Sequence, residues 1–126
     1  SIEIEDNLRG VLVREGKTKE LFITMDPSLS SLATIAYSEI DRIMENPFLF
    51  NLPTQPGLLE KVDNNDLPVV SCDDLDEDTS IILFSIGDEN KIYSEDGCVI
   101  LESTDEEGLI KASDRLMLTI LGVMEP

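Results

Sequence analysis

Histidine is the most informative absence in this chain, which has none in 126 residues. Histidine is the commonest general base and a frequent zinc ligand, so neither Ser-His nor Cys-His catalysis can be assembled from this chain alone. Tryptophan is also absent and aromatic residues make up 5%, which argues against stacking sites for sugars or bases. The glycines match neither common phosphate-binding pattern. The sequence therefore predicts a protein that is not an enzyme and has no cofactor.

Long apolar runs are also missing. The longer ones, such as residues 116–123, are too short to cross a bilayer. No basic and apolar targeting signal opens the chain, and its length is that of one domain. We therefore expect a soluble intracellular protein, cytoplasmic or nuclear. We expect residues 1–126 to form a single acidic domain, and the start at Ser1 fits a segment excised from a longer chain.

Cysteine is scarce, with Cys72 and Cys98 as its two occurrences. They lack the C-x-x-C spacing of zinc and redox sites, and one pair in a chain of this length is not a disulfide framework. Each lies beside a predicted strand, where a free thiol behaves as a small apolar side chain. We therefore expect two buried free thiols with a structural role.

Positively charged residues are few compared with negatively charged ones. The chain has nine Lys and Arg residues and 27 Asp and Glu residues, which gives a net charge of -18. Between residues 63 and 107 there are fifteen acidic residues and one basic residue, Lys91. Such a field repels phosphate backbones and anionic lipid, so we expect neither direct nucleic-acid binding nor membrane binding. It attracts basic proteins or divalent cations.

The densest charge lies in residues 73–78, which we call the acidic segment. It has five carboxylates in six positions. A calcium-binding EF-hand loop starting at Asp74 is rejected, because Thr79 stands where glycine is required and Ser85 where a bidentate glutamate is required. An irregular calcium site built on Asp74, Asp76 and Asp78 remains an alternative. As the candidate partner-binding carboxylates we name those of Asp73, Asp74, Asp76, Glu77 and Asp78.

Residues 47–59 contain three prolines and a cluster of apolar side chains. Prolines at this density exclude a helix or a central strand. One interpretation is a segment buried at the edge of the core, as large apolar residues usually are. The alternative is an apolar lip in which Phe48 and Phe50 anchor a partner. We include both phenylalanines in the candidate partner-binding site.

Local patterns predict the elements of the fold. Residues 10–25 read as a hairpin turning at residues 15–18, and they hold most of a small basic patch. Residues 26–47 predict a helix capped by Asp26, although Ile35 and Tyr37 fall off its apolar stripe and hint at a second contact. Residues 79–103 predict consecutive strands with a turn at Asp96-Gly97. Residues 103–124 predict a helix opened by two overlapping capping boxes, Ser103 with Glu106 and Thr104 with Glu107.

Together these elements predict an α+β fold in the order β-β-α-β-β-β(-β)-α. Two helices would pack on a small, mostly antiparallel sheet made of the N-terminal hairpin and a meander of three to four strands.

For function, we expect a non-catalytic protein–protein interaction module, such as an adaptor, chaperone, inhibitor or complex subunit, whose acidic face binds a basic partner. The alternatives are a calcium-binding protein and an inhibitor that mimics nucleic acid. A homodimer through the basic hairpin or the C-terminal helix is a further hypothesis.

Overall fold

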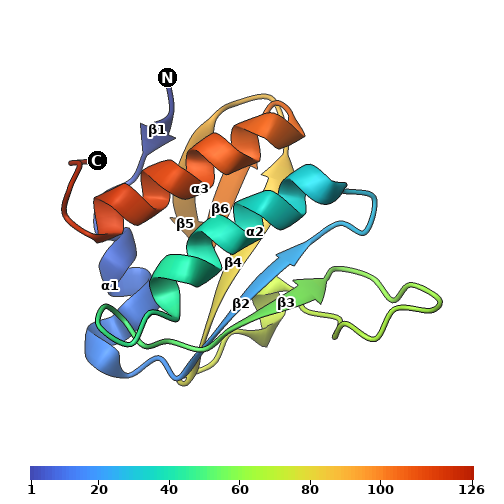
Figure 1. Ribbon diagram of the computed structural model, residues 1–126, viewed down its shortest axis with the longest axis horizontal. Helices are drawn as coiled ribbons and strands as arrows, with labels where there is room; N and C mark the ends of the chain where they lie inside the picture. Colours follow the sequence, from blue (N-terminus) through green and yellow to red (C-terminus); the bar gives the residue numbers. More distant parts are fainter.

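A computed structural model describes all residues from Ser1 to Pro126 as an α/β fold with one six-stranded sheet. The strand order is β1-β5-β6-β4-β2-β3, and every neighbouring pair is parallel except β5–β6. Helices α2 and α3 lie side by side across one face of the sheet (Figure 1). In chain order the elements are β1 (Glu3–Ile4), α1 (Leu8–Val13), the 3-10 helix η1 (Arg14–Gly16), β2 (Glu20–Met25), α2 (Ser31–Met44), β3 (Thr54–Leu58), the 3-10 helix η2 (Cys72–Asp74), β4 (Thr79–Ile86), β5 (Lys91–Glu95), β6 (Cys98–Ser103) and α3 (Glu106–Ile120).

The predicted mostly antiparallel α+β sheet is wrong, and the main cause is the predicted N-terminal hairpin over residues 10–25. The first half of that stretch is helical, with Leu8 and Leu12 buried one helical turn apart. The chain then reverses through left-handed backbone at Arg14 and Glu15. Strand β2 pairs with β3 and β4, in parallel with both. A run of six residues is too short for its periodicity to separate a helix from a strand. The predicted meander is wrong as well, because β4 pairs in parallel with β6, and β5 lies on the other side of β6.

Helix α2 confirms most of the predicted apolar stripe, because Ala33, Ala36, Ile40 and Met44 are all buried, although Leu32 on the same stripe is exposed. It begins later than predicted, since the cap is Ser30, whose side chain accepts a hydrogen bond from the Leu32 amide. The carboxylate predicted to cap it instead closes a tight turn before the helix, where it accepts a hydrogen bond from the Ser28 amide at 2.8 Å.

Helix α3 also begins later than predicted, and both predicted capping boxes are wrong. Its cap is Asp105, whose carboxylate accepts a hydrogen bond from the Gly108 amide at 2.8 Å. The Glu106 carboxylate reaches the start of the neighbouring helix, where it accepts hydrogen bonds from the Ser30 amide at 2.7 Å and hydroxyl at 2.6 Å. The two helix N-termini are therefore joined. No helix combines the length and the apolar character needed to cross a membrane.

Strands β5 and β6 form the one antiparallel pair, and their predicted turn at Asp96-Gly97 is confirmed. Both turn residues have positive φ, 50° at Asp96 and 90° at Gly97. Asp and Gly are among the few residues that tolerate this conformation, which is the reason the dipeptide was a reliable signal.

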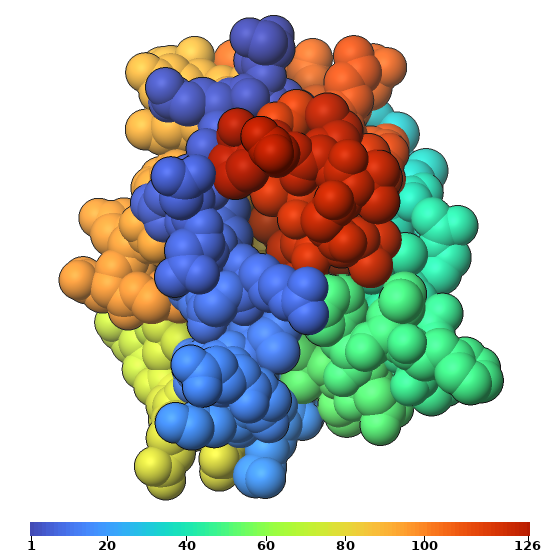
Figure 2. Space-filling model, turned by 90° about the vertical axis from the view of Figure 1, so that its left-hand side faces the viewer, coloured from blue at the N-terminus to red at the C-terminus, as the bar shows by residue number.

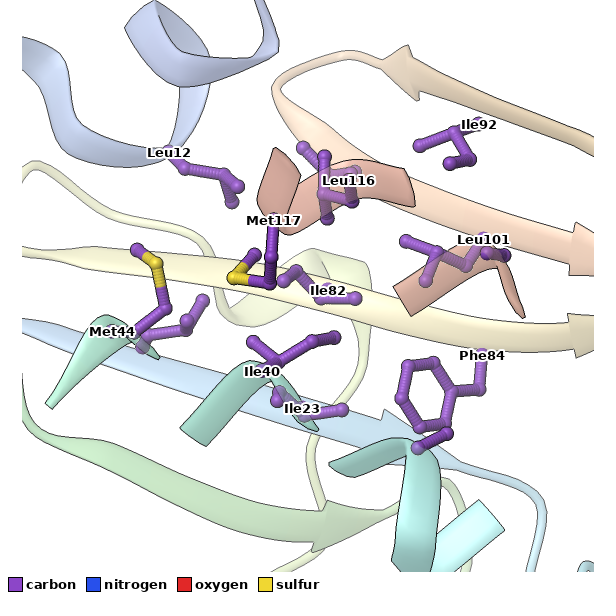
Figure 3. Packing of buried hydrophobic residues seen from close by; sticks show 14 of the residues in the cluster. Leu12, Ile23, Ile40, Met44, Ile82, Phe84, Ile92, Leu101, Leu116 and Met117 are labelled. Atoms are coloured by element: carbon purple, nitrogen blue, oxygen red, sulfur yellow. The ribbon is translucent and has the colours of Figure 1, made fainter. Parts of the chain in front are cut away.

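The main core lies between the helices and the sheet (Figure 3). Ile40 and Met44 of α2 and Met117 of α3 meet strand residues such as Ile82 and Phe84. Successive strand side chains point to opposite faces, so the far face of the sheet carries a second, smaller cluster. Its buried members are Val70, Ile81 and Cys98.

Cys72 and Cys98 form a disulfide on this far face, so the expected free thiols are wrong. Their Cα atoms are 5.6 Å apart, within the usual range for a bridge. The pairing joins the segment before β4 to the first residue of β6, across 26 residues of sequence. No local pattern encodes such a juxtaposition, because it depends on the order of the strands.

Candidate functional site

The acidic segment lies against the far-face cluster of the sheet and ends where β4 begins. All five of its acidic residues are exposed, while Leu75 between them is half-buried and packs on the far-face cluster. The structure therefore brings the predicted carboxylates together on one short stretch of surface. Its one apolar side chain fastens that stretch to the sheet.

Hydrogen bonds within the segment fix its backbone. Ser71 and Asp74 form a reciprocal cap, in which the Ser71 amide donates to the Asp74 carboxylate at 2.9 Å. The Asp76 carboxylate accepts a hydrogen bond from the Asp78 amide at 2.9 Å. This bond is the largest cause that lowers the pKa of Asp76 below its usual value. The side chains of Asp73, Glu77 and Asp78 make no hydrogen bond or ion pair, so they remain free charges.

Three contacts with other parts of the chain hold the segment in place. The disulfide attaches it at Cys72. The Arg14 guanidinium donates to the backbone oxygens of Asp76 and Thr79, the latter at 2.8 Å. Just upstream, the Thr24 hydroxyl donates to the Val70 oxygen at 2.7 Å. A segment fixed in this way loses little conformational entropy when a partner binds.

The amino ends of three parallel strands bring the predicted site residues to one end of the molecule. The Lys19 amide before β2 donates to the Asp78 oxygen before β4 at 2.7 Å. The Leu21 amide donates to the Pro53 oxygen before β3 at 2.9 Å. The acidic segment, the basic residues 14–19 and the loop 46–53 therefore follow one another across this end. Figure 2 shows the N-terminal chain lying between the other two segments.

The two candidate phenylalanines have different environments. Phe48 is 94% exposed, and nothing in its surroundings accounts for an apolar side chain there. Phe50 is half-buried against the core, with the Arg9 guanidinium 5.3 Å from its ring centre. Phe48 therefore fits the predicted apolar lip, whereas Phe50 fits the alternative of a segment packed at the edge of the core.

The carboxylates of Asp74, Asp76 and Asp78, named for calcium, do not converge on a common point. No three or more His, Cys, Asp or Glu side chains lie close enough to hold a metal ion. Asp74 is turned back to the Ser71 amide and Asp76 to the Asp78 amide, so these two carboxylates serve local turns. The arrangement lacks the convergent oxygen ligands that calcium requires.

The two surfaces considered for a homodimer also differ from expectation. The basic patch is not a hairpin, and Arg14 from it is bound to the acidic segment of its own chain. The end of α3 leaves apolar side chains exposed, among them Leu118 and Val123. Leu118 also lines a shallow groove of about 230 Å³ between α2 and α3. The C-terminal end of α3 is therefore the better candidate of the two.

Sequence reasoning missed one concave site, a cavity of about 390 Å³ beside β3. Tyr37 lines it, and the position of Tyr37 off the apolar stripe of its helix was the available signal. The rest of the lining comes from distant segments, so the sequence pattern alone does not reveal it.

No protein-family model, curated protein or solved structure matches the chain.

Proposed function

We propose that the protein is a non-catalytic interaction module whose acidic segment binds a basic segment of a partner protein. The observation that carries this proposal is the exposure of five carboxylates on a backbone already fixed by a disulfide, a side-chain cap and Arg14. Preorganisation lowers the entropic cost of docking, and the surrounding negative field accelerates encounter with a cation.

Phe48 supplies the apolar contact that charge alone does not give. Exposed ion pairs contribute little affinity each, and buried aromatic side chains dominate many interfaces. Phe48 lies at the same end of the molecule as the acidic segment, but the basic residues 14–19 separate the two. A partner that binds both the acidic segment and Phe48 therefore spans the basic residues 14–19. It places its own basic residues against the acidic segment and an apolar pocket against Phe48.

A linear ten-lysine peptide is the simplest probe of the acidic segment. The test variant combines Asp73→Asn, Glu77→Gln and Asp78→Asn, which removes three free charges and keeps the two carboxylates that hold the turns. The control combines Glu60→Gln, Asp63→Asn and Asp66→Asn, three exposed acidic residues in the loop after β3. Both variants change the net charge equally, so the comparison isolates position from total charge.

The test variant should lose about tenfold in affinity at low salt, since three exposed pairs contribute about 0.5 kcal/mol each. The control variant should lose less than a third of the binding free energy that the test variant loses. Equal losses of affinity in the two variants would show that peptide binding depends on the overall charge of the protein, and the proposal of a defined site would be abandoned. Calorimetric titration at two salt concentrations measures both affinities and their salt dependence.

The disulfide also bears on the cellular compartment in which the protein resides. Disulfides persist mainly in oxidising compartments and are rare in the cytoplasm and nucleus, apart from those of hyperthermophiles. We therefore favour an oxidising environment over the intracellular location expected from the sequence. Mass spectrometry of the protein alkylated at lysis decides between them, because only cysteines that are free in the cell gain the label. Two alkylated cysteines per chain would restore the intracellular expectation.

A further inference from the structure

The cavity beside β3 exists because the helix layer does not extend over the outermost strand. Strand β3 is the edge of the sheet, and α2 and α3 cover the strands nearer the centre (Figure 1). The loop that follows β3 folds back alongside it and contributes Val62, Asn65 and Leu67 to the cavity wall. The opposite wall comes from the start of α2 and the residues before it. The cavity has a volume of about 390 Å³, within the range of small-molecule sites.

The lining of this cavity carries no charge. Twelve residues line it and none is Asp, Glu, Lys or Arg, although these make up 29% of the chain. Aliphatic side chains such as Met25, Leu29 and Leu58 supply much of its surface. In a protein of net charge -18 this is a neutral, partly apolar site. An ion entering it would lose hydration without gaining a partner of opposite charge.

Three polar side chains in the wall retain hydrogen-bonding capacity. The Tyr37 hydroxyl donates to the Thr54 oxygen at 3.1 Å, which leaves its own oxygen free to accept. Burial is the main cause that raises the pKa of Tyr37 to about 12, so the hydroxyl stays neutral at physiological pH. The Asn65 side-chain oxygen accepts from the Leu67 amide at 2.8 Å, while its amide nitrogen makes no hydrogen bond. The Thr34 hydroxyl, also in the wall, makes no hydrogen bond. The wall therefore offers acceptors at Tyr37 and Thr34 and donors at Asn65 and Thr34.

The backbone of β3 does not accept an added strand, which removes an extended peptide as the natural occupant. The outward carbonyl of Thr54 is bonded to Tyr37. Pro56, two residues on, has no amide hydrogen. The amide and carbonyl of Leu58 are bonded to the Pro68 oxygen at 2.9 Å and the Val70 amide at 2.8 Å. Of the six outward backbone groups of Thr54, Pro56 and Leu58, four are thus already used or absent, which leaves too few for a continuous ladder with an added strand.

We propose that this cavity binds an uncharged small molecule with a mainly aliphatic body and a single hydroxyl, carbonyl or amide group. The neutral lining and the available hydrogen-bonding groups of Tyr37, Asn65 and Thr34 define this class. The proposal is independent of the acidic segment, which lies on the other face of the sheet.

A series of three six-carbon probes tests the chemical class on the unmodified protein. Hexan-1-ol, hexanoate and hexylammonium share a chain and differ in charge. Titrations followed by ¹H–¹⁵N NMR should show hexan-1-ol shifting the amides of Thr34, Tyr37, Gly57 and Asn65. Its affinity should exceed that of either ion by about tenfold, because a charged head loses hydration in this site. Equal affinities for the three probes, or shifts centred elsewhere, would overturn the proposal.

A blocking variant tests the location. Thr34 is an exposed residue of α2 on the cavity wall, and Ser38 is an exposed residue one turn later that does not line it. Thr34→Trp should abolish the hexan-1-ol shifts, and the matched Ser38→Trp variant should retain them. Binding that survives Thr34→Trp, or that is lost equally in both variants, would place the probe outside the cavity and refute the site.

Discussion

Asp41 on α2 is a carboxyl group in an unfavourable environment. One of its oxygens is buried and accepts no hydrogen bond. Partial burial is the first cause that raises its pKa to about 6, and the neighbouring Glu45 carboxyl is the second. The folded chain therefore holds a proton that the unfolded chain releases near pH 4. It follows that this residue favours folding at low pH and that stability falls as the pH rises towards and through 6.

Replacing Asp41 with Asn should remove this cost. The shift of about two pKa units is discounted to less than 1 kcal/mol because solvent still reaches part of the group and screens it. Asp41→Asn should thus raise the melting temperature at pH 8 by about 2–4 °C and change it little at pH 4.5. Asp63→Asn, at an exposed loop position, is the control for the general loss of one negative charge. An equal gain in both variants would attribute the effect to net charge instead.

Phe48 and Phe50 form a natural matched pair for stability. Phe50 packs against the core, so Phe50→Ala should cost about 2 kcal/mol, less than a fully buried phenylalanine would. Phe48 is 94% exposed, so Phe48→Ala should change the free energy of unfolding by less than about 0.5 kcal/mol. Urea unfolding measures both values. A large loss at Phe48 would mean that this side chain is buried in solution, and its role as an anchor would be withdrawn.

At the scale of elements, the disulfide should contribute much of the stability of the far face. Closing a loop of 26 residues lowers the entropy of the unfolded chain, and this stabilises the folded state by about 3.5 kcal/mol. The double variant Cys72→Ser, Cys98→Ser should lose about that amount in urea unfolding. Amide exchange in residues 71–78 should accelerate with it, because the cross-link no longer holds the segment. Unchanged exchange would show that Arg14 and the side-chain cap suffice to fix the segment.

The elements that sequence reasoning predicted well are those fixed by neighbours in the chain. Helix α2 follows from its apolar spacing, and the β5–β6 turn follows from Asp96-Gly97. The parallel pairing of β2 with β3 and β4 has no local signature, because parallel partners are joined by long connections. Without that pairing, the local pattern of the short helix before β2 predicts the first strand of a hairpin.

The candidate site was predictable to a similar degree. Exposure of the acidic segment follows from its charge density, since ionised carboxylates are almost never buried unpaired. The disulfide, the Arg14 contacts and the neutral cavity join segments that lie far apart in the sequence. Only the order of the strands in the sheet brings these segments together.

For the whole molecule, the dominant feature is self-repulsion from a net charge of -18. Salt should raise the melting temperature gradually by screening this repulsion. Calcium chloride and sodium chloride at matched ionic strength should give closely similar rises, because no three carboxylates converge on a common point. A calcium-specific rise at micromolar concentration would contradict this prediction and restore the calcium-binding alternative.

The disulfide also limits how far the chain can be stretched. When the unfolded chain is pulled by its two ends, residues 73–97 are bypassed by the cross-link between Cys72 and Cys98. At about 3.4 Å per extended residue, the 26-residue separation removes roughly 85 Å of contour length. A single molecule held under tension would lengthen by that step when a dithiol cleaves the bridge. The extended length of one chain therefore reports the oxidation state of its two cysteines.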